Sequence, residues 1–327
     1  MDINQIAQMA GVSRATVSRY LNDGYVSQEK RAAIRRVIEK TGYVPSQHAK
    51  TLRTGKTNVV GIIIPKINSA SVSRMVAGIT PILNEAGYQV LLANTDNDAS
   101  REVNFLRLFS EKNQVDGVIL IATVITPEHR EAISALPVPI VVLDQDVDCC
   151  SCVFQNDYEA MRDVAEVALR TSKHPAYIGV FEEDVAVGQM RRRGFLDACA
   201  RAGIEVPEHA LRIAEFTMDS GYEQAEALLE EYPSVDGIVC ATDSIAHGAL
   251  TCLREYGRRV PEDVLVTGMD DSEISQIVTP TLTTVHLHYK TSGAETAKTL
   301  LSFMTGEEHV VRKIRMGYEV VTRNSTR

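Results

Sequence analysis

Apolar residues recur every three or four positions over the first forty residues, which is the spacing of amphipathic helices. Ser13 and Ser27 stand where a serine hydroxyl can cap the first turn of a following helix. Gly42 suits a helix end, since glycine readily adopts the left-handed conformation found there. The sequence therefore predicts three short helices, over residues 3–10, 14–21 and 28–40.

From residue 59 the pattern changes to short apolar runs that alternate with amphipathic segments. The run at 59–64, VVGIII, is typical of a strand buried on both faces. Strands and helices are then predicted to alternate over residues 59–64, 71–86, 88–94, 100–112, 117–122, 127–136 and 140–143. This alternation favours an α/β fold with a parallel, doubly wound sheet.

The α/β pattern occurs twice along the chain. Residues 115–119, VDGVI, return 120 positions later as VDGIV at 235–239. Gly87 and Gly203, each preceded by Ala, lie 116 positions apart. Two similar α/β lobes are therefore predicted, with a small-molecule cleft between them.

Charge is distributed unevenly over the 327 residues, whose net charge is −9. Residues 1–58 hold ten Lys/Arg and four Asp/Glu, whereas the remainder carries a net charge of −15. A basic end on an acidic body is expected when that end binds nucleic acid.

The basic end also has the spacing of a helix-turn-helix. Ala7, Gly11 and Val17 take the places of the small residue, the turn glycine and the buried β-branched residue. Arginine can bind guanine edges or phosphate, and serine and threonine suit phosphate oxygens. The second helix would present outward Arg14, Ala15, Thr16, Ser18 and Arg19.

Residues 6–22, IAQMAGVSRATVSRYLN, resemble the head of the LacI/GalR family of bacterial transcription regulators. Residues 42–46, GYVPS, resemble that family's hinge, and the similarity continues to about residue 323. Within the family, the chain is most similar to sugar-responsive repressors of the sucrose/fructose or trehalose-6-phosphate type. The resemblance implies a small all-α head and a two-lobed, periplasmic-binding-protein-like body of two doubly wound parallel sheets.

The resemblance also implies domain boundaries and DNA contacts. The expected domains are a head at 1–45, a hinge at 46–57, an N-terminal lobe at 58–156 plus 289–316, and a C-terminal lobe at 157–288 plus 317–327. The hinge would fold as a helix on DNA, and Leu52 would wedge into the minor groove. Ser46 departs from the usual Asn but can still cap that helix. The expected DNA-binding residues are Ser13, Arg14, Ala15, Thr16, Arg19, Asn22, Tyr43, Ser46 and Leu52.

Candidate ligand-binding residues follow the predicted strands, because small ligands bind at the carboxyl ends of parallel strands. Lys66, Ser69, Ser71, Asp144, Asp243 and Asp270 occupy such positions. The resemblance adds Phe154, Arg191 and Tyr289. Lys66 and the two serines near a helix start would suit an anion, such as the phosphate group of a phosphorylated sugar. A phosphorylated sugar and a neutral sugar both remain open as the ligand. A purine is a third alternative, disfavoured by the few aromatic residues.

Other classes of protein receive little support from the sequence. Glycine-rich nucleotide loops and a nucleophile elbow are absent, so neither an enzyme nor a cofactor is expected. Cys149, Cys150 and Cys152 form a thiol cluster with no second cysteine pair nearby to complete a metal site, which favours reduced thiols over a zinc or redox site. His286 and His288 are interpreted as structural, and no metal is expected.

No apolar run approaches the length of a membrane span, and the N-terminus lacks the pattern of a signal peptide. A cytoplasmic protein without a membrane partner is therefore expected. A transport binding protein is the main alternative, but it would have no use for residues 1–58. We expect a homodimer, because two heads would read a pseudo-palindromic operator.

Overall fold

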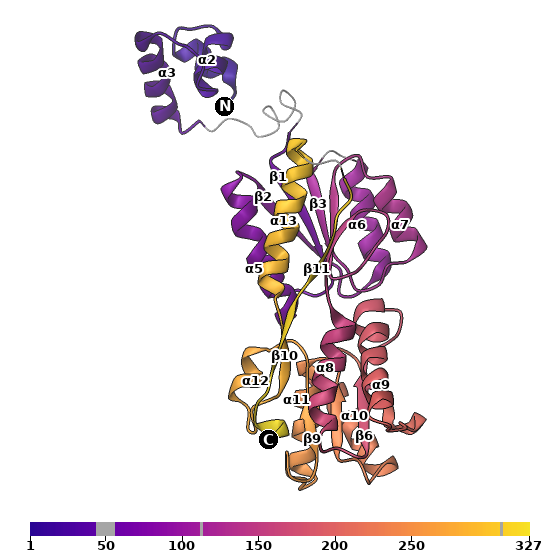
Figure 1. Ribbon diagram of the computed structural model, residues 1–327. Helices are drawn as coiled ribbons and strands as arrows, with labels where there is room; N and C mark the ends of the chain where they lie inside the picture. Colours follow the sequence, from indigo (N-terminus) through magenta and orange to yellow (C-terminus); the bar gives the residue numbers. More distant parts are fainter. Residues whose placement is uncertain (44–55, 112–113, 308–309) are drawn as a thin grey trace. The chain divides into compact units, whose positions relative to one another are not determined.

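The computed structural model describes residues 1–43, 56–111, 114–307 and 310–327, which divide into two compact units, 1–58 and 59–327 (Figure 1). The first unit contains helices α1 (Ile3–Met9), α2 (Arg14–Leu21) and α3 (Gln28–Thr41), as predicted. Its core consists of Ile6, Ala7, Val17, Val26 and Ile34.

Local signals define the ends of these helices. Gly11 has a φ of +62° in the turn between α1 and α2. The Ser13 hydroxyl accepts a hydrogen bond from the backbone N–H of Thr16, which confirms the predicted cap of α2. Gly42 is left-handed and ends α3, also as predicted. The expectation for Ser27 is only half right, because it occupies the N-cap position of α3 but its side chain makes no capping hydrogen bond.

The second unit begins with a parallel sheet of six strands in the order β11-β5-β4-β3-β1-β2. The strands are β1 (Val59–Ile64), β2 (Gln89–Asn94), β3 (Gly117–Ile121), β4 (Ile140–Leu143), β5 (Ser151–Gln155) and β11 (Lys313–Met316). Its helices are α5 (Ala70–Glu85), α6 (Ala99–Glu111), α7 (Pro127–Ser134) and α13 (Tyr289–Thr305). The elements predicted over residues 59–143 agree with these bounds to within two residues.

The continuous apolar run of β1 is explained by burial on both faces of this sheet. Ile62 and Ile64 belong to the cluster that includes the inner face of α5, whereas Ile63 belongs to the cluster beneath α6 and α7. Figure 1 shows α5 and α13 side by side on one face and α6 and α7 on the other. Neighbouring residues of a strand point to opposite faces, so each face required its own apolar set.

A second parallel sheet follows, with the strand order β7-β6-β8-β9. Its strands are β6 (Pro175–Gly179), β7 (Leu211–Ile213), β8 (Gly237–Cys240) and β9 (Leu265–Thr267). Around it lie α8 (Asp157–Leu169), the π-helical turn η1 (Val185–Met190), α9 (Arg191–Arg201), η2 (Glu208–Ala210), α10 (Met218–Glu231), α11 (Asp243–Glu255) and α12 (Glu273–Ile277). An antiparallel pair, β10 (Thr284–Leu287) with β12 (Tyr318–Val321), and the short turn η3 (Asn324–Thr326) complete the unit.

The internal repeat is visible in how α5 and α9 end. Gly87 and Gly203 have φ angles of +82° and +70°. The next residue in each case, Tyr88 or Ile204, donates its backbone N–H across the helix end over 2.9 Å. The same helix ending leads into the edge strand β2 in the first lobe and toward η2 and β7 in the second.

The chain passes between the lobes three times. It leaves β5 for α8, returns from β10 to α13, and leaves β11 for β12. The second passage packs α13 against α5 so closely that glycine is needed at the crossing: a Cβ at Gly78 would overlap the carbonyl oxygen of Lys290, and one at Gly293 would overlap that of Met75. Two glycines therefore let these helices seal one face of the sheet.

Substituting Gly78→Ala should destabilise the second unit by about 2 kcal/mol, because the new methyl group meets backbone atoms that cannot rotate away. The gain in helix propensity, about 1 kcal/mol, offsets only part of this loss. Urea unfolding measures the change. The control Gly317→Ala meets no atom within 4 Å and should stay within about 0.5 kcal/mol of the parent. Equal stability of the two variants would contradict the tight crossing.

Candidate effector pocket and nucleic-acid interface

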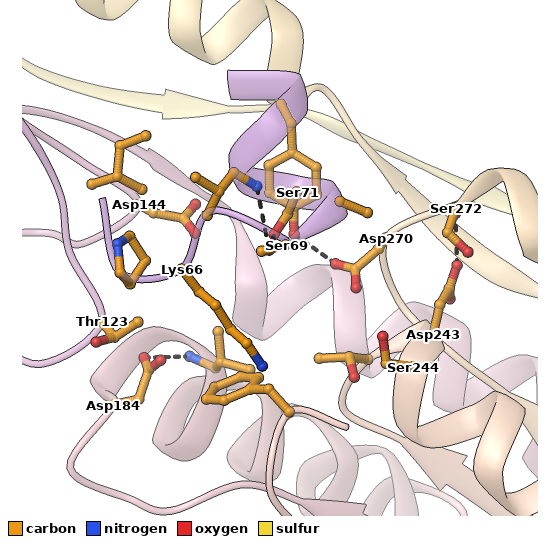
Figure 2. Close-up of a pocket in the computed structure, with 18 of the residues that line it drawn as sticks. Lys66, Ser69, Ser71, Thr123, Asp144, Asp184, Asp243, Ser244, Asp270 and Ser272 are labelled. Carbon is orange, nitrogen blue, oxygen red and sulfur yellow. Dashed lines mark hydrogen bonds between the residues drawn. The ribbon is translucent and has the colours of Figure 1, made fainter. Parts of the chain in front are cut away.

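A pocket of about 310 Å³ lies at the carboxyl ends of strands from both parallel sheets (Figure 2). Its wall combines the segment after β1 with the ends of β4, β8 and β9. The structure brings together there eight residues proposed from the sequence: Lys66, Ser69, Ser71, Asp144, Arg191, Asp243, Asp270 and Tyr289. Six of these residues were proposed from their places after strands, and Arg191 and Tyr289 from the family resemblance.

Phe154, the ninth candidate, does not line this pocket. It lies on β5, packs against the apolar cluster beneath α6 and α7, and lines a separate pocket of about 440 Å³. None of the residues of β5 is among those that line the first pocket, and Phe154 lies on the face of the sheet that α6 and α7 cover. The expectation of a ligand contact at Phe154 in this pocket is therefore wrong.

Arg191, the first residue of α9, is held by buried partners rather than by solvent. Its side chain is 2% exposed, and Nε donates to Asp157 Oδ1 over 2.7 Å. Nη1 donates to the carbonyl oxygen of Ala241 over 2.6 Å and lies 4.0 Å from Asp270 Oδ1. The guanidinium is thus fixed in the wall of the pocket, with one carboxylate committed to it.

Asp270 and Tyr289 form a second fixed pair across the pocket. The Tyr289 hydroxyl donates to Asp270 Oδ1 over 2.6 Å, and the Arg74 guanidinium lies 4.9 Å from the centre of the tyrosine ring. Burial raises the pKa of Asp270 to about 6, although the charge of Arg191 opposes this rise. Asp270 has a φ of +137°, a backbone conformation that non-glycine residues seldom adopt.

Asp144 follows β4 with a φ of +79°, and its backbone N–H donates to Val153 O over 2.8 Å. Its Oδ1 is buried and, among the described residues, accepts no hydrogen bond. Burial, followed by the negative charge of Asp157, raises the pKa of Asp144 to about 8. Among the described residues that line the pocket, this carboxyl group is the one with a buried side-chain oxygen that has no hydrogen-bond donor.

Asp243 lines the same pocket but is fully engaged by the protein. Its two carboxylate oxygens accept hydrogen bonds from Ser272 N over 2.7 Å, Ser275 Oγ over 2.6 Å and Thr284 Oγ1 over 2.5 Å. These contacts tie the start of α11 to α12 and β10. The carboxylate is therefore suited to holding the pocket wall together.

Lys66, Ser69 and Ser71 lie together after β1, as the sequence predicts (Figure 2). The Ser69 hydroxyl caps α5 by accepting from Val72 N, and it lies 2.9 Å from the Ser71 hydroxyl. Figure 2 shows the Lys66 side chain extending across the pocket. Within the described part of the chain, no ion pair or hydrogen bond holds its ammonium group.

Two acidic residues of the site were missed from the sequence. Asp184, before η1, accepts from Gln145 Nε2 over 2.7 Å and from Val187 N over 3.0 Å, and burial raises its pKa to about 6. Asp157 is the buried partner of Arg191. Asp157 comes two residues after β5, so the carboxyl-end rule could have found it, whereas Asp184 lies beyond a loop after β6.

The candidate nucleic-acid interface lies on α2 of the first unit. Arg14, Ala15 and Arg19 are exposed, as a base-reading helix requires. Thr16 is half-buried, and its hydroxyl lies 2.9 Å from that of Ser13. Asn22, at the C-cap of α2, is exposed.

Three of the predicted DNA contacts follow α3 in the sequence. Tyr43 is half-buried against the core of the first unit, which leaves only part of its ring accessible. Ser46 and Leu52 lie outside the described residues, so the hinge contacts remain predictions.

The six cysteines are free, and burial raises the pKa of Cys152 and Cys150 above the usual range. The described residues contain no group of three or more His, Cys, Asp or Glu side chains suited to a metal ion. They also contain no helix long and apolar enough to cross a membrane.

Residues 2–46 match the bacterial regulatory proteins of the lacI family, and residues 168–326 match a periplasmic binding protein-like domain. The sucrose operon repressor of Staphylococcus xylosus is 30% identical over 322 residues, 97% of this chain and 99% of that protein. Catabolite control protein A of Priestia megaterium is 31% identical and covers 99% of each chain. The chain belongs to the LacI family of bacterial transcriptional regulators.

Solved structures of this LacI-family regulator's relatives have the same architecture. A complex of the transcriptional regulator CelR with cellobiose has a TM-score of 0.77 at 28% identity, over 99% of both chains. The lac repressor dimer bound to operator has a TM-score of 0.90 at 22% identity, over 100% of this chain and 99% of that chain, and this likeness shows the fold alone. The predicted helix-turn-helix head and two-lobed body of parallel sheets are confirmed.

Removing the partner of Arg191 should destabilise the LacI-family body strongly. In Asp157→Asn the guanidinium keeps its charge in a buried site, and losing one partner of a buried pair costs about 3–5 kcal/mol. Guanidinium chloride unfolding measures this. The control Glu295→Gln breaks an exposed pair with Lys298 and should cost about 0.5 kcal/mol or less. A loss below about 1 kcal/mol in Asp157→Asn would show that the remaining contacts suffice.

The free energy of unfolding of the ligand-free protein should fall as the pH rises from about 4 to about 8. The folded-state pKa of Asp144, about 8, lies above its ordinary 3.8, so the folded state binds more protons than the unfolded state in this window. Asp184 and Asp270 contribute in the same sense up to about pH 6.

The matched variant is Asp144→Asn, which cannot ionise at this position. Its loss of stability between about pH 5 and about pH 8 should be smaller than that of the parent by at least about 1 kcal/mol, since one pKa unit corresponds to about 1.4 kcal/mol. Unfolding in urea at the two pH values gives both differences. Identical pH dependence in parent and variant would mean that Asp144 ionises normally.

Proposed function

We propose that the chain is a homodimeric repressor that binds a pseudo-palindromic operator through its heads and changes operator affinity when a sugar binds in the pocket. The observation that carries this proposal is the pocket itself, whose polar residues come from both lobes while the same chain carries an exposed basic recognition helix. Such a regulator acts in the cytoplasm, where bacterial DNA lies. No cofactor or catalytic step is needed.

The relatives support a sugar as the class of effector. One relative is a sucrose operon repressor, and another of known structure is in complex with cellobiose. Hydroxyls and carboxylates from several segments line the pocket of this chain, together with the aromatic ring of Phe216. Sugars are bound by such groups, with polar side chains on the hydroxyls and an apolar ring on a sugar face.

The charges of the pocket favour an uncharged or cationic sugar over a phosphorylated one. Arg191 is paired with the buried Asp157. Among the described lining residues, Lys66 is therefore the cation that has no acidic side chain bound to it. Asp144, Asp184 and Asp270 face the same space. The serines expected to hold an anion bond to each other and to the start of α5, which weakens the case for a phosphate.

A purine receives less support than a sugar. The aromatic lining residues are Phe216 and Tyr289 among those that the structure describes. The Tyr289 hydroxyl is committed to Asp270, and its ring contacts Arg74, so this ring is not free to stack on a base.

A ligand that bridges the lobes would control the head through the geometry of the body. Ser69 and Asp144 belong to the first lobe, whereas Arg191 and Asp270 belong to the second. A ligand that contacts both sets stabilises one arrangement of the lobes, and in a dimer this would change the spacing of the two hinges. Operator DNA must then change the affinity for the ligand by the same factor.

A dimer is supported by the edge of the first sheet. β2 is an edge strand, and its Leu91 and Leu92 are 42% and 43% exposed. Large apolar side chains on an open edge usually require a covering partner in a soluble protein. Two heads held by a dimer would each bind one half of a pseudo-palindrome.

Operator binding tests the proposal directly. Sequences selected by the full-length protein from random DNA duplexes should share a pseudo-palindrome, and fluorescence anisotropy should show an affinity that falls steeply with salt. Addition of the effector sugar should change that affinity. Failure to select any common sequence would overturn the DNA-binding role and leave a ligand-binding protein as the alternative.

Arg14→Ala should weaken operator binding about 10-fold or more and relax the preference at one base pair of each half-site, because arginine contributes about 1–3 kcal/mol of base discrimination. Anisotropy on the selected operator and its single-base variants measures both effects. The control Arg170→Ala removes an exposed arginine from the second unit and should leave binding unchanged. An equal loss on every DNA sequence would assign Arg14 to a phosphate instead.

A further inference from the structure

The pocket contains more negative than positive charge, even after its internal ion pair is counted. Four carboxyl groups line it, those of Asp144, Asp184, Asp243 and Asp270, and even with Asp144 protonated the other three outnumber the lining cations Arg191 and Lys66. Since Asp157 lies behind the wall and takes up the charge of Arg191, Lys66 faces an excess of carboxylates. Arg74 approaches from α5, but it is directed to the Tyr289 ring and the Asp271 carbonyl.

The carboxylates differ in how well the protein satisfies them. Asp243 accepts three hydrogen bonds, Asp184 accepts bonds from Gln145 and Val187, and Asp270 accepts the Tyr289 hydroxyl. Asp144 Oδ1 is buried and accepts none from the described residues. A buried oxygen without a donor is unfavourable, so a ligand that donates to it should bind about 10-fold more tightly than one that does not.

The surroundings of Asp144 select for a positively charged donor. Burial and the negative charges of Asp157, Asp184 and Asp270 disfavour the ionised form of Asp144, and the charge of Arg191 offsets this only in part. A ligand hydroxyl can donate one hydrogen bond to Asp144 but brings no charge that favours its ionised form. An ammonium group donates three hydrogen bonds and also neutralises charge, so it satisfies both requirements at once.

The rest of the wall points to a sugar rather than to a simple amine. Ser69, Ser71, Thr123 and Ser244 supply hydroxyls around the cavity (Figure 2). Phe216 supplies an aromatic ring in addition to that of Tyr289. A polyamine would leave these hydroxyls without partners. A sugar with one amino group matches both the hydroxyl-rich wall and the carboxylate excess.

We infer that the effector of this protein is an amino sugar whose ammonium group binds at Asp144, with Asp184 as the second carboxylate that selects for its charge. This inference rests on the function proposed above, because it names the class of sugar that the same pocket accepts. Arg191 and Asp270 remain available for the sugar hydroxyls. An N-acetylated sugar would lose the charge and add a bulky group at this position.

Isothermal titration calorimetry on the full-length protein tests this with matched pairs of ligands. The pairs are glucosamine with glucose, galactosamine with galactose, and the glucosamine disaccharide with cellobiose, each pair differing only in amino groups that replace hydroxyls. In at least one pair the amino sugar should bind about 10-fold or more tightly than its neutral partner, as expected for a charge-assisted hydrogen bond in place of a neutral one. The N-acetylated form should lose that advantage.

Two variants identify the carboxylate responsible. Asp144→Asn should reduce the preference for the amino sugar to within about 3-fold, and Asp184→Asn gives an independent reading if the first variant fails to fold. The control Asp219→Asn removes an exposed carboxylate from α10 and should keep the full preference. An unchanged preference in both Asp144→Asn and Asp184→Asn would overturn the assignment of the charge-selecting residues.

The outcome also separates this inference from the proposed function. Neutral sugars that bind as tightly as their amino partners, and that shift operator affinity, would overturn the inference and leave a sugar-responsive repressor. Absence of binding by every member of the panel would overturn the inference, while operator selection with the same preparation decides the DNA-binding role separately. Selective binding of glucose 6-phosphate over glucose would contradict the charge argument itself.

Discussion

The buried contact between Arg191 and Asp157 is the interaction on which the pocket depends. Their side chains are 2% and 4% exposed, so neither charge is compensated by water. The pair joins the starts of α9 and α8. Nη1 of Arg191 also donates to the carbonyl oxygen of Ala241, directly after β8. A buried ion pair adds little net stability by itself, but the loss of either member is costly, so the pair constrains the geometry of the wall.

That constraint has an electrostatic consequence for the ligand. Arg191 is paired with Asp157, so its charge is not free to neutralise the other carboxyl groups of the pocket. Those groups differ in the hydrogen bonds that the protein donates to them. Asp243 acts as a structural brace, whereas Asp144 has a buried oxygen without a protein donor. A ligand that donates a hydrogen bond to Asp144 would therefore stabilise the site. In this way a ligand can favour one conformation of a protein.

Close packing supplies the rigidity that allows such a site to act at a distance. α13 enters the first lobe directly after the crossover at His288, and it is pressed against α5 at two glycine contacts. Ser69 caps the start of α5, and Tyr289 begins α13, so both helices of this crossing contribute a residue to the pocket. Movement at the ligand would thus be transmitted through a helix pair with little freedom to slide.

Features that depend on local interactions could be predicted from the chain alone. Apolar periodicity, the Ser13 cap and the Gly11 turn specify the head within a few residues, because each acts between neighbours in the chain. The carboxyl-end rule placed Asp144 and Asp270 at the pocket for a similar reason: parallel strands end at the same edge of their sheet.

The fold was needed to show which of these groups act together. Asp184 and Gln145 meet although 39 positions separate them, and Arg191 meets Asp157 over 34 positions. The position of Phe154 depends on which face of the sheet its side chain lies on. The lack of a donor at Asp144 Oδ1 depends on which donor groups the fold places near it. Such pairings follow from long-range packing, so they cannot be predicted from a single sequence.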